Sequence, residues 1–267
     1  MGGLRPSGLN VNKPVVFGLV LLCLVIFLVY RYSFESEIQT EEIMAAPVPE
    51  TLPDLDEAVL SRESKEFNLT LGDKSVRIHV EQVLKKSTVP KLDILFLHGA
   101  SFTSQNWLEI KSLDHVANWG YRGVAIDLPG KGKTDAIAAS ESGKFLDAFI
   151  SALHMSNVVI VSPSASGVYS LSYLFDDPEL SAEIVKGFVP IAPVQTHAYT
   201  SKYSESQIPT LIVYGTKDSQ GPLVLNDLKL LPKSEVAPIT DAGHACYMDK
   251  PDQFHKVLYN FLQKLSS

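Results

Sequence analysis

Cysteine is scarce in this sequence, because its 267 residues include only Cys23 and Cys246. The first lies in an apolar run near the N-terminus and the second lies near the C-terminus. Two residues placed so far apart cannot supply a disulfide framework or the clustered ligands of a structural zinc site. We therefore expect no disulfide and no metal. This does not fix the compartment, since a domain of this length can also do without disulfides in an oxidising one.

An excess of positive charge is also missing. The chain has 23 Lys and Arg residues against 30 Asp and Glu residues, which gives a formal net charge of -7. No stretch of the sequence is strongly basic. Nucleic-acid binding draws most of its affinity from the neutralisation of phosphates by Lys and Arg, so we expect no nucleic-acid partner.

A complete nucleotide-binding loop is absent as well. Residues 130–134 read GKGKT, which is similar to the end of a phosphate-binding loop. The full pattern needs a glycine five places before Gly132, and Asp127 stands there. We interpret the segment as a turn after a strand, with its lysines in solvent. No G-x-G-x-x-G follows an expected strand either, so no dinucleotide or other cofactor is expected.

One long hydrophobic run is present, at the N-terminus. Residues 15–30 are apolar apart from Gly18 and Cys23, and tyrosines stand at 30 and 32. This pattern predicts a transmembrane signal anchor over residues 15–32 with tyrosines in the membrane interface. A cleaved signal peptide is the alternative, but the small residues of a cleavage site do not follow the run closely.

The charges that flank this run predict its orientation. Arg5 and Lys13 precede the run, whereas glutamates dominate the stretch after it. Because basic residues favour the cytoplasmic side, we expect a single-pass type II protein with residues 1–14 in the cytoplasm. The rest of the chain then lies in a lumen or outside the cell, and the cytoplasmic face is the alternative. Residues 33–64 are acidic and contain three prolines, which predicts a stalk.

Asn68 begins the only N-x-[ST] triplet of the chain, Asn68-Leu69-Thr70. Such a triplet is the acceptor for N-glycosylation in a lumenal or secreted domain. Asn68 is therefore the expected glycosylation site, in agreement with the predicted orientation.

The remaining residues, 65–267, predict one α/β domain. Two alternating runs at 66–71 and 76–83 are typical of a hairpin. The later pattern predicts strands at 93–97, 123–126, 158–161, 188–191, 210–214 and 234–239. It predicts helices at 104–118, at 143–154, after the strand at 158–161 and through about residue 175, and at 251–265. Repeated strand and helix units of this kind favour a mostly parallel central sheet with helices on both faces.

Reactive residue types follow several of the expected strands. They are His98, Asp127, Ser164, Asp218 and His244, each located just beyond an apolar run. In parallel sheets the ligand site forms beyond the carboxyl ends of the strands, so these side chains are expected to meet there.

The segment 158–167, VVIVSPSASG, predicts a buried strand that turns sharply into a helix. It follows the nucleophile-elbow pattern G-x-S-x-G, with Ser162 and Ser166 in place of the glycines and Ser164 at the apex. Small residues allow the close backbone approach that such a turn needs. Pro163 removes one backbone donor and stiffens the approach to the turn, so we expect an elbow that is tight and polar.

Acyl transfer needs a hydroxyl nucleophile, an imidazole that takes its proton and a carboxylate that holds the imidazole in the right tautomer. Ser164, His244 and Asp218 fit these three roles in that order. The developing oxyanion needs two further donors. The backbone N–H groups of Ala165 and Ala100 are the candidates, because one follows the nucleophile and the other lies in the loop after the third strand.

Alternatives exist for each role. Ser162 and Ser166 compete with Ser164 as the nucleophile, and Asp241 competes with Asp218 as the acid. His98 is expected to shape the oxyanion loop, and Cys246 to fill the core. The remaining histidines are expected at the surface or at interfaces, without a chemical role: His79, His115, His154, His197 and His255.

Taken together, these segments resemble the α/β-hydrolase superfamily from about Glu66 to the C-terminus. The motifs that carry the resemblance are Leu97-His98-Gly99, Asp127-Leu128-Pro129-Gly130-Lys131-Gly132, the elbow, Gly215-Thr216-Lys217-Asp218 and Gly243-His244. The resemblance implies an α/β-hydrolase fold and a Ser-Asp-His hydrolase without a cofactor. It also places the acid after the seventh strand, which favours Asp218 over Asp241.

Large acyl substrates in this superfamily often go with a helical lid between the sixth and seventh strands. The interval 196–209 is too short for several helices, which predicts a minimal cap. It is also polar, with Tyr199, Lys202, Tyr203 and Glu205. We therefore expect a small acyl substrate carried on an ester, a thioester or an amide. The alternatives are an acyltransferase or deacetylase that passes a short acyl group to an acceptor, and a non-catalytic binding or scaffold protein on the same fold.

Overall fold

The computed structural model describes residues 50–138 and 141–266. The predicted cytoplasmic segment 1–14, the predicted anchor 15–32 and the first part of the predicted stalk lie outside these ranges. Among the residues described, no helix has the length and apolar character that crossing a membrane requires.

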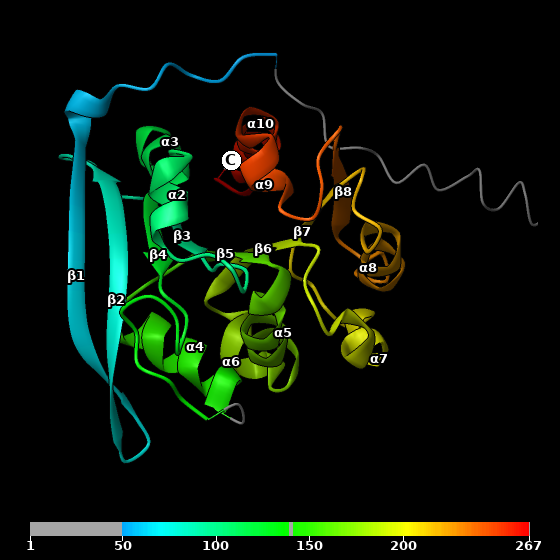
Figure 1. Ribbon diagram of the computed structural model, residues 1–267, viewed down its shortest axis with the longest axis horizontal. Helices are drawn as coiled ribbons and strands as arrows, with labels where there is room; N and C mark the ends of the chain where they lie inside the picture. Colours follow the sequence, from blue (N-terminus) through cyan, green and yellow to red (C-terminus); the bar gives the residue numbers. More distant parts are fainter. Residues whose placement is uncertain (1–49, 139–140, 267) are drawn as a thin grey trace, which may run out of the picture. The chain divides into compact units, whose positions relative to one another are not determined.

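Within the described chain, one sheet of eight strands runs in the order β1-β2-β4-β3-β5-β6-β7-β8 (Figure 1). The strands are β1 (Leu60–Leu71), β2 (Lys74–Lys85), β3 (Asp93–Phe96), β4 (Arg122–Ile126), β5 (Val158–Pro163), β6 (Val185–Ile191), β7 (Thr210–Gly215) and β8 (Ser234–Ile239). The β1–β2 and β2–β4 pairs are antiparallel, and every later pair is parallel. The predicted mostly parallel sheet is confirmed.

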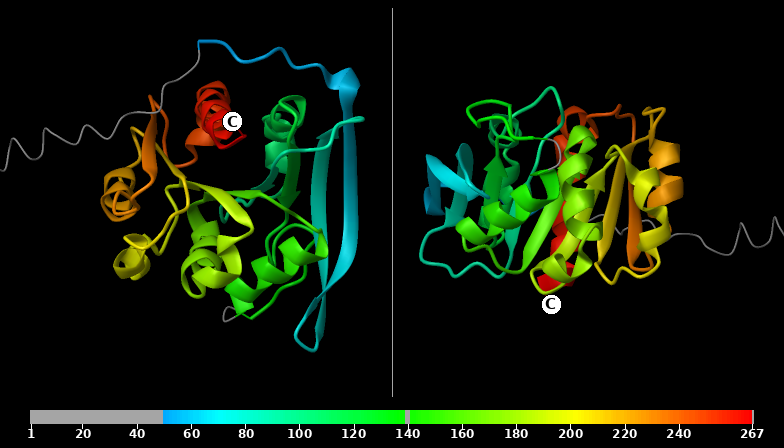
Figure 2. Two further views of the ribbon diagram at one scale, coloured as in Figure 1. Left: turned by 180° about the vertical axis from the view of Figure 1, so that it is seen from behind. Right: turned by 90° about the horizontal axis from the view of Figure 1, so that it is seen from below.

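Helices cover both faces of the sheet, as predicted. On one face lie α2 (Gln105–Glu109), α3 (Ser112–Asn118), α9 (Cys246–Asp249) and α10 (Pro251–Ser266), and on the other lie α4 (Ser142–Ala152), α5 (Gly167–Phe175), α6 (Pro178–Ala182), α7 (Thr200–Tyr203) and α8 (Gly221–Leu228). Figure 2 shows the same two layers from behind, with the β1–β2 hairpin at one end of the sheet and β8 with α8 at the other. The described residues also form the short 3-10 helices η1 (Glu57–Val59), η3 (Ser164–Ser166) and η4 (Thr196–Tyr199).

Each face of the sheet has its own apolar core. Alternate residues of the central strands enter opposite cores, so that Leu95 and Ile160 pack beneath α4 and α5 while Phe96 and Val161 pack beneath α3 and α10. All four side chains are fully buried. Burial on both faces is why these strands appear in the sequence as short continuous apolar runs.

The opening hairpin is longer than the sequence indicated. Strand β1 begins at Leu60, inside the stretch 33–64 that we expected to form a stalk, and β2 continues to Lys85. Many side chains of β1 are exposed and polar, so its first part carries little of the apolar signal that marks a strand. Asn68 lies on β1 opposite Arg77, and its side chain is exposed.

The helix expected over 104–118 is two helices. Lys111 adopts a left-handed backbone conformation (φ 59°) between α2 and α3, which ends the first helix and starts the second in a new direction. Helix α8 was not predicted at all. It has eight residues and begins with Gly221 and Pro222, two residue types that favour turns in a sequence pattern, although Pro fits the first turn of a helix well.

A polar contact lies in the core between α3 and α10. Ser112 Oγ is 2.8 Å from Nε2 of His255, and the His255 ring packs 4.6 Å from that of His115, measured between centroids. His255 is 1% exposed, so the expectation that it lies at a surface is wrong. Burial, together with the neighbouring His115, lowers the pKa of His255 to about 3. Burial also lowers the pKa values of His98 and His115.

These histidines predict acid sensitivity. Folded His255 stays neutral below its ordinary pKa of 6.5, whereas the unfolded chain binds the proton, so the stability is present above pH 6.5 and is lost as the pH falls below it. His255 alone should then lower the free energy of unfolding by roughly 1 kcal/mol per pH unit between pH 6.5 and 5. Denaturant unfolding of the wild type and of His255→Gln, which keeps a partner for Ser112, measures this slope. Parallel pH curves for the two proteins would contradict the prediction.

Candidate active site

The elbow is built at the end of β5. The strand stops at Pro163, and Ser164, the first residue of η3, takes a left-handed backbone conformation (φ 51°) before α5 begins. A non-glycine residue in this region costs on the order of 1 to 3 kcal/mol, and such strain persists only where the surroundings hold it. Gly167 allows the close approach that holds it, because a Cβ atom at this position would lie 2.4 Å from the Val194 carbonyl oxygen. The sharp turn expected from the sequence is present.

Three of the predicted residues meet beyond the carboxyl ends of the strands. Nε2 of His244 lies 2.8 Å from Ser164 Oγ, and Nδ1 of His244 lies 2.7 Å from Asp218 Oδ2. Ser164 follows β5, Asp218 follows β7 and His244 follows β8, so three strands of the parallel part of the sheet deliver the triad, with β6 between β5 and β7. The structure therefore brings the predicted nucleophile, base and acid into one hydrogen-bonded row.

The hydrogen bonds set the tautomer of His244. Ionised Asp218 can only accept, so Nδ1 of His244 carries the proton and the lone pair of Nε2 faces Ser164 Oγ. Asp218 is buried, and its second oxygen accepts the backbone N–H of Gln220 at 3.0 Å. It therefore also caps the turn before α8. The side chain of His244 is 39% exposed, which leaves it open to a substrate.

The alternatives to these residues are occupied elsewhere. Asp241 is exposed and pairs with Lys217 at 3.0 Å, and this ion pair lowers the pKa of Asp241. Ser162 and Ser166 are fully buried, with their hydroxyls 2.9 Å apart. Cys246 is also buried, and burial raises the pKa of its thiol to about 12, so the sulfur holds its proton at neutral pH.

The loop after β3 lies beside the elbow. A Cβ atom on Gly99 would be 3.6 Å from Cβ of Ser164, so the backbone around Ala100 borders the nucleophile. His98 shapes this loop, because its Nδ1 donates to the Gly99 carbonyl at 2.8 Å while its Nε2 accepts the Leu128 N–H at 2.9 Å. Both ring nitrogens are engaged and burial lowers the pKa of His98, so the ring is a neutral support rather than a proton carrier.

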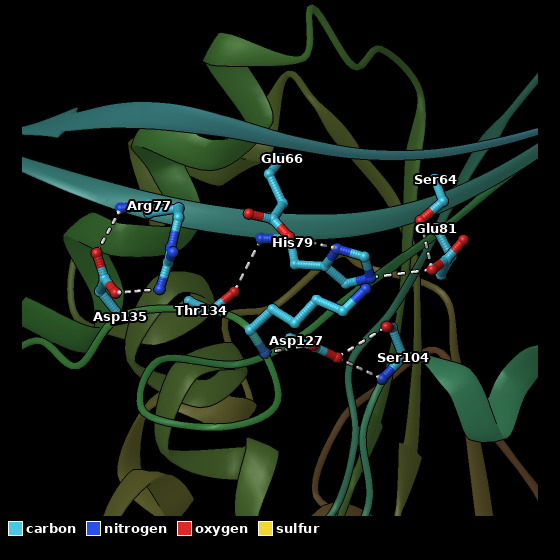
Figure 3. Close-up of polar contacts among 10 residues, drawn as sticks. Ser64, Glu66, Arg77, His79, Glu81, Ser104, Asp127, Thr134 and Asp135 are labelled. Carbon is cyan, nitrogen blue, oxygen red and sulfur yellow. Dashed lines mark hydrogen bonds and ion pairs between the residues drawn. The ribbon is translucent and has the colours of Figure 1, made fainter.

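Asp127 fastens the far end of the same loop (Figure 3). Its Oδ1 accepts from the backbone N–H and the hydroxyl of Ser104 at 2.8 and 2.7 Å, and its Oδ2 accepts the Lys133 N–H at 2.9 Å. Gly132 has φ 50°, and a Cβ atom there would lie 1.9 Å from Asp127 Oδ2. The GKGKT segment is thus the turn after a strand that we expected, with both lysines exposed. The structure adds that the turn wraps around the Asp127 carboxylate, for which Gly132 makes room.

Figure 3 also shows a buried polar contact between His79 and Glu81, which we did not predict. His79 is 4% exposed, and its Nε2 lies 2.9 Å from Glu81 Oε1, which Ser64 Oγ also contacts at 2.8 Å. The backbone N–H of His79 donates to Thr134 Oγ1 at 2.9 Å. This hydrogen bond connects the β1–β2 hairpin to the loop after β4. The expectation of a surface position is wrong for His79. The i, i+2 spacing of His79 and Glu81 on one strand face was the available signal.

A cavity of 1260 Å³ lies at the opposite edge of the sheet, near Leu92, Asn157 and Pro209, where strands begin. None of the three aligned residues lines this cavity, so its size says nothing about their chemistry. Lys202 and Glu205 do line it, while Tyr203 is fully buried and donates to the Thr196 carbonyl. These side chains therefore do not supply the polarity that we predicted for the site.

The described residues contain no group of three or more His, Cys, Asp or Glu side chains that could hold a metal ion.

Comparison with known proteins adds a family to this geometry. No protein-family model matches the sequence. The chain is 37% identical to ABHD14B of Rattus norvegicus over 212 residues, which cover 74% of this chain and 99% of that relative. It is 41% identical to the protein ABHD14A of Danio rerio over 186 residues, which cover 67% of each chain.

Solved structures show the same fold. A protein from Thermoplasma acidophilum, described as a predicted CIB-like hydrolase, matches with a TM-score of 0.67 at 22% identity, over 76% of this chain and all of that chain. An esterase from Exiguobacterium antarcticum matches with a TM-score of 0.60 at 15% identity, over 75% of this chain and 99% of the other. The sequence relatives and the fold agree, and the chain belongs to the ABHD14 family of α/β-hydrolases.

Proposed function

We propose that this hydrolase cleaves a small acyl group from an amide, an ester or a thioester through an acyl-Ser164 intermediate. The observation that carries the proposal is the row of hydrogen bonds from Asp218 through His244 to Ser164, with distances of 2.7 and 2.8 Å. These distances lie within the range that a nucleophile, its base and the orienting group require.

In the first half of the proposed reaction, Ser164 Oγ attacks the acyl carbonyl carbon while its proton moves to His244 Nε2. Asp218 stabilises the imidazolium through the bond to Nδ1. The carbonyl oxygen becomes an oxyanion, which the N–H groups of Ala165 and Ala100 stabilise by hydrogen bonding. The carbon–heteroatom bond then breaks, and the leaving amine, alcohol or thiol receives the proton from His244.

In the second half, a water molecule replaces the leaving group. His244 takes one proton from the water as its oxygen attacks the acyl carbonyl, and the same two N–H groups stabilise the oxyanion. The bond between the acyl carbon and Ser164 Oγ then breaks, and His244 returns the proton to Oγ. The products are the free acid and the unchanged enzyme.

The segment between β6 and β7 supports a short acyl group. It contains only η4 and α7, and it is fastened by the bond from Tyr203 to Thr196 and by Thr196 Oγ1 to Asp227 Oδ2 at 2.7 Å. A segment this short offers no long apolar wall, so a long acyl chain would lie in solvent. The short length of this segment, and not the polarity of its side chains, therefore supports a short acyl group.

The relatives support an amide as the acyl carrier. ABHD14B of Rattus norvegicus and of Homo sapiens carries the provisional name protein-lysine deacylase. By analogy, an acylated lysine side chain is the substrate class that we propose for this chain. An amine leaving group needs a proton, and His244 holds one after the first attack.

Replacing the nucleophile tests the reaction. We expect Ser164→Ala to lose labelling by a fluorophosphonate probe and to lower esterase turnover by more than about 1000-fold, because the attacking hydroxyl is gone. Asp218→Asn should lower turnover strongly as well, whereas Asp241→Asn is the matched control and should not. Continued labelling of folded Ser164→Ala would contradict the proposal, and absence of labelling in folded wild type would favour a binding protein.

Acyl-chain length tests the substrate. On p-nitrophenyl acetate, butyrate and octanoate we expect kcat/KM to be highest for the acetate and to fall with length, because the short segment covers little of a long chain. Peptides with acetylated or longer-acylated lysines then test the amide class with the same ordering. A kcat/KM that rises with chain length would contradict the prediction.

We also propose that the hydrolase domain lies in a lumen or outside the cell, on the basis of the charges that flank residues 15–32. The exposed position of Asn68 on β1 is compatible with a glycan there. Expressed as the full chain in secretory cells, the protein should lose apparent mass on treatment with an N-glycosidase, and Asn68→Gln should abolish this shift. An unshifted wild type whose C-terminus is accessible from the cytosol would contradict the proposed orientation.

A further inference from the structure

Three buried hydroxyls lie beneath the elbow. Ser162 Oγ is 2.6 Å from Ser170 Oγ and 2.9 Å from Ser166 Oγ, and Ser166 Oγ is 2.7 Å from the Pro163 carbonyl oxygen. All three serines are 0% exposed. We refer to Ser162, Ser166 and Ser170 as the serine chain. It begins on α5, crosses to the end of β5, and ends on the carbonyl that precedes the proposed nucleophile.

The proton direction along the serine chain is fixed by chemistry. A carbonyl oxygen only accepts, so Ser166 must donate to Pro163, and each hydroxyl has a single proton to give. Ser166 therefore accepts from Ser162, and Ser162 accepts from Ser170. Each hydroxyl proton in the serine chain therefore has a single acceptor, and the last hydroxyl, that of Ser166, donates to the Pro163 carbonyl oxygen.

That carbonyl controls the backbone that leads into Ser164. The peptide bond is planar and trans, so fixing the Pro163 C=O also fixes the plane that carries the Ser164 N–H. On the other side, the Ser164 C=O accepts from the Val194 N–H at 2.9 Å, which fixes the plane that carries the Ala165 N–H. The two peptide planes around Ser164 are thus held from opposite sides.

The usual residues at these two elbow positions could not do this. The common pattern has glycines where this chain has Ser162 and Ser166, and glycine has no hydroxyl to hold the preceding carbonyl. Here the side chains occupy the crowded space and contact each other at 2.9 Å. The strain of the left-handed Ser164 is thereby opposed by hydrogen bonds from within the elbow itself.

We propose that Ser166 is a positioning residue for Ser164. Its hydroxyl, oriented by Ser162 and Ser170, holds the Pro163 carbonyl and so keeps Ser164 Oγ within reach of His244 Nε2. This inference rests on the proposed serine hydrolase function, because it assigns Ser166 a task in that same site. Ser166 touches no reacting atom, and it acts through the backbone at Pro163.

Removing the hydroxyl tests the proposal. In Ser166→Ala we expect kcat on p-nitrophenyl acetate to fall by about 10- to 100-fold with little change in KM, because a small misplacement of the nucleophile slows chemistry more than it weakens binding. Ser162→Ala breaks the serine chain one step earlier and should give a smaller loss. Ser172→Ala is the matched control, since this α5 serine bonds to Asp176 outside the serine chain.

Substitution by glycine separates positioning from mere space filling. Ser166→Gly restores the common motif but lacks the hydroxyl, so it should be as slow as Ser166→Ala. If Ser166→Gly or folded Ser166→Ala keeps the wild-type kcat, and only the melting temperature falls, the hydroxyl is merely structural and the proposal is overturned. If Ser166→Ala does not melt cooperatively, the kcat of folded Ser162→Ala is compared instead: a lower kcat supports the proposal, and a wild-type kcat overturns it.

Labelling by a fluorophosphonate keeps the two proposals apart. Wild type that labels, with Ser164→Ala unlabelled, establishes the hydrolase site independently of Ser166. Slower labelling of Ser166→Ala in that background supports the positioning role, and an unchanged rate overturns it alone. Wild type that is folded but does not label overturns both proposals together.

Discussion

The left-handed conformation of Ser164 at the end of β5 is the constraint on which the site depends. It turns the chain from a buried strand into η3, which leads into α5, and it places Oγ 2.8 Å from His244 Nε2. A serine does not hold this conformation unaided. The bond from Val194 to its carbonyl and the bond from Ser166 to the Pro163 carbonyl hold it, together with the close approach that Gly167 permits.

The rest of the fold delivers partners to that point. Parallel strands end at one edge of the sheet, so the residues that follow β5, β7 and β8 meet there although 80 residues separate Ser164 from His244. The loop after β3 is shaped by His98 and fastened by Asp127, which keeps its backbone beside the elbow. The two apolar cores on either side of the sheet pack against the strands that carry these residues.

The sequence alone predicted the architecture, because strands that are buried on both faces of a sheet appear as short continuous apolar runs. Short apolar runs with reactive residues behind them predicted the strands, their mostly parallel pairing, and the places of Ser164, Asp218 and His244. The boundaries of the hairpin were less visible, since the exposed side chains of β1 hide its first part. Helix α8 was not visible in the sequence, because Gly221 and Pro222 are residue types that favour turns. The helix is stabilised by the burial of Val224 and Leu228 against other parts of the chain, which a local pattern does not report.

Only the tertiary structure decided between residues of the same type. Asp218 and Asp241 both precede His244 in the chain, but one is buried against its imidazole and the other pairs with Lys217 at the surface. His255 has no distinctive neighbour in sequence, and only long-range packing makes it a buried partner of Ser112. His79 has Glu81 two places along the same strand, but its burial depends on the remote loop that contains Thr134. Sequence patterns report which residue types follow which strands. Which carboxylate or hydroxyl reaches which partner depends on distances between segments remote in the chain, and packing of the whole domain sets these.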